Sequence, residues 1–237
     1  MRLKLTLAYD GSDYRGWAAQ PGLRTVETVV REALDVIFPS WSGLVVAGRT
    51  DAGVHSLGNV ASVDVEGGPA GGRVAEALNS ALPDDVAVIA VEQALPDFNA
   101  RFAARSRSYR YRIWRSRLRS PFEARRSWWY PQPLDPERLK AQASYLAGEH
   151  DFRAFTPTET RHKEFVRGIK EARWVEAGDA LMFEITAGSF LRHMVRALVG
   201  TMVDGVDLEP LLAGRPRSDA GQTAPPWGLY LIQVAYD

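Results

Sequence analysis

The order in which two hydrophobic periods alternate along this chain restricts its fold more than any other feature. Apolar side chains recur at every second residue in some segments, as in strands, and every three to four residues in others, as in helices. In the first half they give the order strand, helix, strand, strand, helix, strand. These segments cover residues 2–9, 25–38, 44–47, 58–64, 73–82 and 86–91.

The second half repeats this order, although no sequence repeat connects the two halves. Asp135 and Pro136 suit the N-cap and first position of a helix, and Gly178-Asp179 suits a hairpin turn between two strands. The predicted segments are a strand at 106–114, a helix from Asp135 to Ala147, strands at 166–175 and 180–187, a helix that begins after Gly188, and a strand at 229–236.

Two β-α-β-β-α-β halves predict two ferredoxin-like units and therefore an α+β fold. We expect their mostly antiparallel sheets to join into one larger sheet. Helices would pack on one side of it, and a central cleft would lie between the halves on the other side. The expected boundary divides the chain into residues 1–104 and 105–237.

The composition is typical of a globular protein with a sizeable core, because 46% of the 237 residues are hydrophobic. The chain has no cysteine, which excludes disulfides, thiolate metal sites and cysteine nucleophiles. Its four histidines show no close paired spacing, so we expect no metal site. No apolar run reaches membrane-spanning length, and the first residues alternate like a strand rather than a signal peptide. We therefore expect a soluble cytoplasmic protein.

Basic residues are unevenly distributed, although 29 basic and 29 acidic residues leave no net charge. Residues 101–126 contain ten arginines and one acid, with aromatic residues between them. Such a run is usually a solvated face, but arginine suits bidentate phosphate contacts and aromatic rings stack on bases. The segment predicts a nucleic-acid backbone footprint, with Arg110 and Arg112 on one face of the strand and Tyr109 on the other.

A polar loop connects two strand-like runs in the first half. Its sequence, Gly48-Arg49-Thr50-Asp51-Ala52-Gly53-Val54-His55, contains one carboxylate between two glycines. Loops mounted on a rigid scaffold often carry catalytic groups, and the Arg49 guanidinium favours a charged Asp51, available as a nucleophile. On composition alone, an Asx-type turn capped by Asp51 explains the loop equally well. We expect His55 to close this turn by hydrogen bonding rather than to titrate in catalysis.

Motifs along the whole chain resemble the TruA family of tRNA pseudouridine synthases. The loop residues 49–55 look like the signature of that family, and several ordered motifs at compatible spacings are more specific than any one of them. The further motifs are Tyr9-Asp10-Gly11-Ser12 with Gly16-Trp17, Phe98-Asn99-Ala100-Arg101, Tyr109-Arg110-Tyr111, Gly148-Glu149-His150-Asp151-Phe152, residues 189–196 and residues 225–231. The chain departs from the family pattern at Ala18 and around residues 67–72. These differences affect RNA contacts made by loops and not the residues expected to carry out the chemistry.

The resemblance implies an isomerase that converts uridine to pseudouridine at positions 38, 39 and 40 in the anticodon arm of tRNA. It implies no cofactor and no metal. It also implies a homodimer in which one tRNA contacts both subunits.

By resemblance, Asp51 is the catalytic carboxylate. It could attack C1′, attack C6 of the ring or remove the 2′ proton, and a carboxylate is chemically suited to each. Arg49 is placed to assist flipping of the uridine out of its stack or to hold a neighbouring phosphate.

The resemblance assigns three further residues to the site. Tyr109 would stack on the target base and assist proton transfer from C5; otherwise it is a half-buried strand tyrosine. Arg196, with Arg192 one turn earlier on a helix face, would pair with Asp51. Without the resemblance, the sequence predicts only a solvated or phosphate-binding arginine at this position. Leu229 would pack against the uracil, or belong to an ordinary core strand.

Two rival functions remain compatible with the fold. A non-catalytic RNA-binding module would use the same ferredoxin-like units, and a pseudouridine synthase could act on a different RNA. A hydrolase with paired carboxylates fits less well, because no second loop carboxylate accompanies Asp51 in the sequence.

Overall fold

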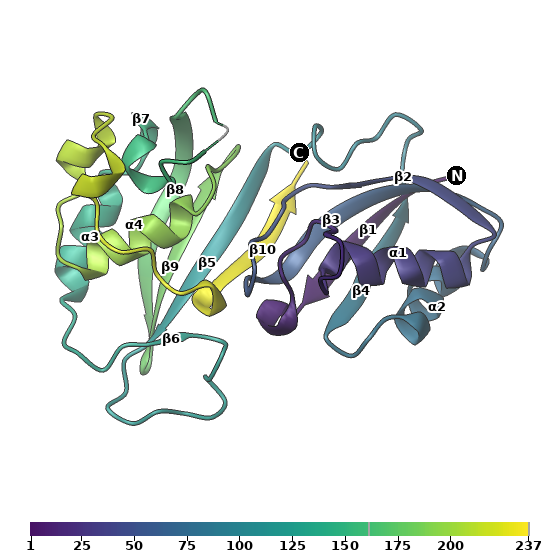
Figure 1. Cartoon of the computed structure of the whole chain (residues 1–237), viewed down its shortest axis with the longest axis horizontal. Coiled ribbons are helices and arrows are strands. Elements are labelled where there is room, and N and C mark those ends of the chain that lie inside the picture. Colours follow the sequence, from purple (N-terminus) through teal and green to yellow (C-terminus); the bar gives the residue numbers. More distant parts are fainter. Residues whose placement is uncertain (161, 237) are drawn as a thin grey trace. The chain divides into compact units, whose positions relative to one another are not determined.

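A computed structural model describes residues 1–160 and 162–236. They form two compact units (Figure 1). The first contains residues 1–105 together with the end of the chain from Leu231, and the second contains residues 106–230. The predicted boundary between residues 104 and 105 stays a prediction, as does the cleft between the halves.

The first unit has the predicted β-α-β-β-α-β order. Thr25 caps the first helix, since its side chain accepts a hydrogen bond from the backbone N of Thr28. The elements are β1 (Arg2–Tyr9), α1 (Val26–Ile37), β2 (Ser40–Val46), β3 (His55–Glu66), α2 (Val74–Ala81) and β4 (Val86–Gln93). Most strands extend a few residues beyond the predicted runs, because pairing continues past the apolar positions.

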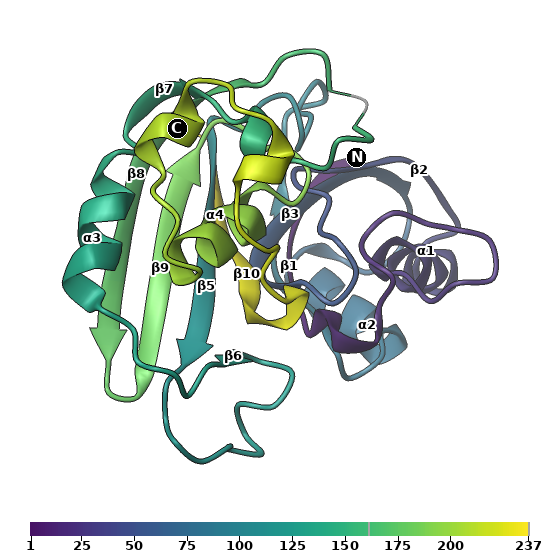
Figure 2. The same ribbon diagram turned by 60° about the vertical axis from the view of Figure 1, so that its left-hand side comes forward.

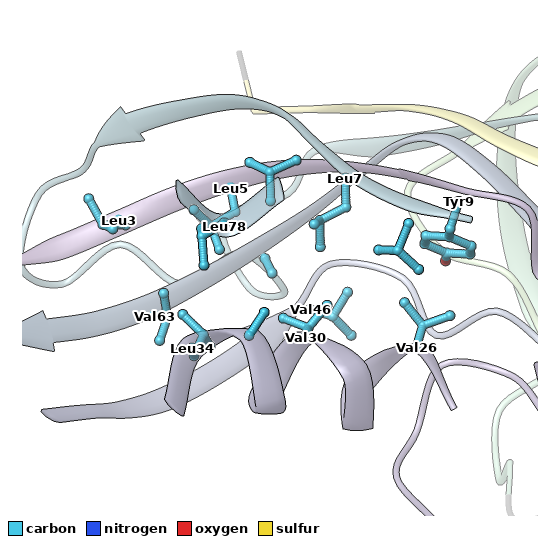
Figure 3. Packing of buried hydrophobic residues seen from close by; sticks show 14 of the residues in the cluster. Leu3, Leu5, Leu7, Tyr9, Val26, Val30, Leu34, Val46, Val63 and Leu78 are labelled. Carbon is cyan, nitrogen blue, oxygen red and sulfur yellow. The ribbon is translucent and has the colours of Figure 1, made fainter. Parts of the chain in front are cut away.

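Strand β1 supplies the core of the first unit because alternate side chains point to one face. Leu3, Leu5 and Leu7 are buried there, and Val30 and Leu34 of α1 pack against the same core (Figure 3). The helices α1 and α2 lie against each other as well. Burial of this face fixes the register of β1 between β3 and β4, both antiparallel to it.

The long strand β3 has different neighbours along one of its edges. Residues from Ala61 to Glu66 pair with β2. Further towards its start, Ser56 Oγ donates a hydrogen bond to the carbonyl of Leu231, in the last strand β10 (Leu229–Ala235). Arg105 N also donates to the carbonyl of Ala235 at 2.8 Å. The end of the chain is therefore built into the first unit.

The second unit contains a sheet in the order β5-β9-β8-β7, in which each neighbouring pair is antiparallel. The helices α3 and α4 cover one face of it, α3 against β8 and α4 against β5 (Figure 2). The elements are β5 (Ser106–Trp114), β6 (Trp128–Trp129), α3 (Pro136–Ser144), β7 (Gly148–Asp151), β8 (Val166–Ala177), β9 (Ala180–Ala187) and α4 (Met194–Val203).

Three features of the second unit differ from the predicted segments. Helix α3 ends at Ser144 rather than Ala147, since a short strand, β7, begins at Gly148. Strand β6, which pairs in parallel with β5, is too short to show a period. Helix α4 begins only at Met194, because His193 adopts a left-handed backbone with φ of 62°.

The predicted α+β class with mostly antiparallel strands is confirmed. Across the described part of the chain, no helix combines the length and apolar character needed to cross a bilayer.

Candidate active site

Asp51 lies in the loop between β2 and β3, where it begins a tight turn. The backbone N of Val54 donates to the carbonyl of Asp51 at 3.1 Å. Gly53 has a φ of 77°, which a residue with a side chain rarely adopts at this position of such a turn. The main-chain carbonyl therefore closes the turn. The side chain of Asp51 is half-buried.

The segment that follows β1 holds this turn from one side. Trp17 N donates to the carbonyl of Thr50 at 3.0 Å, and Gly53 N donates to the carbonyl of Tyr14 at 3.2 Å. Gly16 comes so close that a Cβ there would lie 2.8 Å from the carbonyl oxygen of Thr50. The backbone on both sides of Asp51 is thus fixed by main-chain hydrogen bonds.

A buried polar network holds the loop from below. The hydroxyl of Tyr9 lies 2.8 Å from Thr50 Oγ1, and Asn59 Nδ2 donates to the same hydroxyl at 3.2 Å. Asn59 also donates to the carbonyl of Gly48 and accepts from its backbone N. Burial raises the pKa of Tyr9 to about 12, against smaller lowering effects of its hydrogen bonds with Thr50, Asn59 and Ser56. Such a satisfied network orders the residues on either side of Asp51.

His55 closes the loop at its far end. Its side chain is buried, and Nδ1 lies 3.1 Å from both the backbone N of Gly11 and Oδ1 of Asp10. His55 does form hydrogen bonds, as predicted, but they join the loop to the segment after β1, and the turn itself is closed by the backbone N of Val54.

Arg49 is exposed beside helix α1. Its charge acts on Glu27, in the first turn of α1. Burial raises the pKa of Glu27, but hydrogen bonds from Arg31 and from the backbone of Ala19 lower it. The charges of Arg31 and Arg49 lower it further, so the pKa of Glu27 is below its usual value. Arg49 thus presents a positive charge on the loop next to Asp51, which suits the predicted phosphate contact.

In the second unit, Tyr109 lies on the inner face of β5, opposite Ile185 of β9. It is half-buried, and its ring meets the ring of Phe190 edge-on, with centroids 5.0 Å apart. This contact fixes the plane of the tyrosine ring, as a stacking platform for a base requires.

Tyr111, two residues further along the same face, is fully buried. It contacts the segment that leads to Leu229, and it feels the charge of Arg196. Its hydroxyl donates to the carbonyl of Pro225 at 2.8 Å. Burial raises its pKa, while the positive charge of Arg196 acts in the opposite direction. A Cβ at Gly228 would lie 2.7 Å from the Tyr111 ring, so the residue before Leu229 packs directly on it.

Arg196 occupies the first turn of α4, where a cation opposes the helix dipole. Its Nε donates to the carbonyl of Ala224 at 2.8 Å, and the backbone N of Ala224 donates back to the carbonyl of Arg196. A half-buried arginine at the less favourable end of a helix suggests a role beyond stability. The predicted helical face with Arg192 is wrong, because the left-handed residue at 193 places Arg192 before the helix.

Leu229 is buried at the start of β10. It follows the Pro226–Gly228 turn, which positions it next to the contact between Gly228 and Tyr111.

Arg110 and Arg112 project from the opposite face of β5, and both are paired within the unit. Arg110 donates twice to Oε1 of Glu184, at 2.7 and 2.9 Å. Arg112 forms a two-point contact with the carboxylate of Glu123, at 2.7 and 2.9 Å. Their predicted contact with RNA stays a prediction, and it would have to compete with these carboxylates.

The candidates therefore form two groups. Asp51 and Arg49 lie on the loop of the first unit, while Tyr109, Arg196 and Leu229 belong to the second. The pairing of Arg196 with Asp51 stays a prediction.

Sequence reasoning expected Tyr9 to be structural for the first strand and its loop, but it missed two supporting residues, Asn59 and Tyr111. No sequence signal distinguishes Asn59, because β3 contains several other polar residues, among them Ser56, Ser62 and Asp64. Nothing in the alternation of β5 distinguishes Tyr111 from Tyr109, since both lie on its inner face.

A sequence model of the family described as tRNA pseudouridine synthase matches residues 142–237, which include Arg196 and Leu229. tRNA pseudouridine synthase A of Bacillus licheniformis is 38% identical over 246 residues, which cover 100% of both chains. The protein of the same name from Moorella thermoacetica is 41% identical over 243 residues, covering 99% of each chain. That from Bacillus subtilis is 38% identical over 246 residues, again covering 100% of each. The chain belongs to the tRNA pseudouridine synthase A family.

Among solved structures, a chain of a Cbf5-Nop10-Gar1 complex aligns over 94% of this chain and 56% of its own length. The TM-score of 0.36 and the 11% identity are too low to add to this assignment.

Proposed function

We propose that this protein isomerises uridine to pseudouridine in tRNA, at positions 38, 39 and 40 of the anticodon arm, and that it acts in the cytoplasm as a homodimer without a cofactor. The observation that carries the proposal is the Asp51 loop. Hydrogen bonds from two sides fix its backbone, and its one carboxylate lies in residues 49–55, which resemble the signature of the family to which the chain belongs.

The reaction breaks the bond between N1 and C1′, turns the uracil and joins C5 to C1′. The proton leaves C5 and one is gained at N1, so the product has the same atoms as the substrate. Asp51 would act at C1′, at C6 or on the 2′ proton, and the three roles share the need for a charged carboxylate at a fixed point.

The second unit would hold the base while it turns. Tyr109, with its ring plane set by Phe190, would stack on the uracil and assist removal of the C5 proton. Leu229 would exclude water from the other face. Arg196 would orient the carboxylate of Asp51, which requires its guanidinium to keep the position set by Ala224.

The proposal is tested with an unmodified tRNA transcript, by release of tritium from C5 of uridine. We expect Asp51→Asn and Asp51→Ala to bind tRNA and to resist urea like the wild type, but to form no pseudouridine. A loop carboxylate contributes little to the core, so folding should survive. Asp84→Asn, which removes an exposed loop carboxylate of the same unit, is the matched control and should remain active.

Transcripts with uridine at only one of the three positions would show which are substrates. Pseudouridine formed by Asp51→Ala would remove Asp51 from the catalytic role. Wild-type binding without product would favour a non-catalytic RNA-binding protein, and product only with another RNA would correct the substrate.

A further inference from the structure

The second unit contains a cavity of about 690 Å³ outside the group formed by Tyr109, Arg196 and Leu229. Its volume falls within the range of sites that bind small organic ligands. The walls come from the end of β5, from the connection between β5 and β6, from β6 itself and from the turn before β10. The lining residues are Trp114, Arg119, Ser120, Pro121, Glu123, Ala124, Arg125, Ser127, Trp128, Trp129, Pro225 and Trp227.

Two properties show that the aromatic wall can accept a ligand. Trp129 and Trp227 are 39% and 40% exposed, so part of each large apolar ring faces solvent. The indole N–H of Trp114 is buried and has no hydrogen-bond partner among the residues that the structure describes. A buried donor without a partner costs free energy, and an acceptor on a bound molecule would remove that cost.

The cavity is also positively charged. Its one acid, Glu123, is compensated by the two-point contact from Arg112, which lowers the pKa of Glu123. Arg119 and Arg125 also line the cavity, both exposed, and the Arg119 guanidinium lies 5.5 Å from the centre of the Trp129 ring. A ligand here would meet aromatic faces and cations together, close to a buried donor that lacks a partner among the described residues.

We propose that this cavity binds an unpaired base of the RNA substrate, with an adjoining phosphate on Arg119. A nucleotide supplies a flat face for the tryptophans, ring acceptors for the Trp114 N–H and negative charge for Arg119. An apolar peptide would satisfy only the first of these. The inference rests on the proposed function, since it assigns the ligand to tRNA.

The site is distinct from the one for the target uridine. Trp114 and Tyr109 lie five residues apart on β5, a separation of roughly 17 Å along an extended strand. One bound base cannot span that distance, so the cavity would take another nucleotide. Its role would be to position the tRNA rather than to act in the chemistry.

The test compares tRNA affinity and turnover for variants of the exposed wall. Stacking of a base on an aromatic ring is worth ~1–3 kcal/mol by alanine substitution, so Trp129→Ala should weaken binding of unmodified tRNA by about 5-fold to 150-fold. Trp129→Phe should recover most of the affinity. Turnover at saturating tRNA should stay near the wild-type value for both variants.

Tyr145→Ala is the matched control, because Tyr145 is 41% exposed, close to the exposure of Trp129, but lies outside the arginine-rich segment and does not line the cavity. Its affinity should not change. Arg119→Ala leaves all the tryptophan rings of the cavity in place, so it should lower affinity even if Trp129→Ala proves unstable to urea.

The outcomes separate this inference from the proposed function. Wild-type affinity in both Trp129→Ala and Arg119→Ala, with normal product formation, would overturn the cavity site alone. If the wild type formed no pseudouridine while these variants still lost affinity for tRNA, the proposed function would fail and the binding site would hold. Unchanged affinity with a smaller sedimentation coefficient would instead assign the cavity to a contact between copies of the chain.

Discussion

At the scale of single residues, the hydroxyl of Tyr9 connects the core to the loop that carries Asp51. Tyr9→Phe should lower the free energy of unfolding by about 1–3 kcal/mol, because Thr50 and Asn59 lose a buried partner. Since the loop would lose a support without losing a tRNA contact, turnover should fall more than affinity. Tyr145→Phe, which changes an exposed tyrosine, should alter neither.

The same variant should change the response to alkali. The folded-state pKa of Tyr9 is raised from 10.0 to about 12, so the unfolded chain releases this proton first. The contribution of Tyr9 to stability is therefore complete below pH 10 and is lost as the pH rises through about 12, an effect of roughly 3 kcal/mol. Urea unfolding across this interval should show a smaller loss in Tyr9→Phe. An identical loss would mean that the buried Tyr14 and Tyr111, whose pKa values are also raised by burial, account for it.

At the scale of elements, the short 3₁₀ helix at Gly11–Asp13 sets the position of the Asp51 turn. A Cβ at Gly11 would overlap the backbone carbonyl of Val54. Gly11→Ala should therefore displace the turn, reduce turnover strongly and cost about 1–3 kcal/mol of stability. Gly72→Ala is the control, since a Cβ there would meet nothing within 4 Å. Normal turnover in Gly11→Ala, measured by tritium release, would show that the turn tolerates this shift.

Most elements of the first unit could be predicted because they have a strong hydrophobic period, as the alternation from Leu3 to Tyr9 illustrates, whereas β2 lacks one and was predicted only as the run 44–47. Where tertiary contacts decided the structure, the sequence was less informative. The beginning of α4 depends on the left-handed backbone of His193, and the strand β6 exists only because it pairs with β5. Neither has a local pattern that periodicity could detect.

The residues of the candidate site that belong to a short motif could be predicted from the sequence. The buried residues that support them could not. Asp51 stands out between two glycines in a polar loop. Asn59 and Tyr111 became visible only through their partners, Gly48 and Pro225, which are distant in sequence. Pairings that arise from the fold in this way are not contained in any short window of residues.

At the scale of the whole molecule, the arginine-rich segment should make tRNA binding strongly dependent on salt. Each phosphate contact contributes a log–log slope near −0.7 to −0.9. Arg119→Ala should flatten the slope by about one such contact. Arg110→Ala should flatten it less, because Glu184 already compensates Arg110. Binding measured over a range of salt concentrations tests both, and salt-independent binding of the wild type would contradict the footprint.

Assembly is the second prediction at this scale. A symmetric dimer is the commonest closed assembly, and the family resemblance implies that one tRNA contacts both subunits. We expect sedimentation at micromolar concentration to show a dimer, and full-length tRNA to be a much better substrate than an isolated anticodon stem-loop. A monomer with full activity on tRNA would contradict recognition by two subunits.

The return of β10 to the first unit has a consequence for biosynthesis. Chains emerge from the ribosome N-terminus first, and domains usually fold as they appear. Here the residues that complete the edge of β3 are translated after the second unit, so Tyr236 donates to the carbonyl of Ala100 only once residues 106–230 have been made. The loop that holds Asp51 is thus mounted on a scaffold that stays unfinished until β10 has been made, so a chain cut short within the second unit would lack the strand that completes this scaffold.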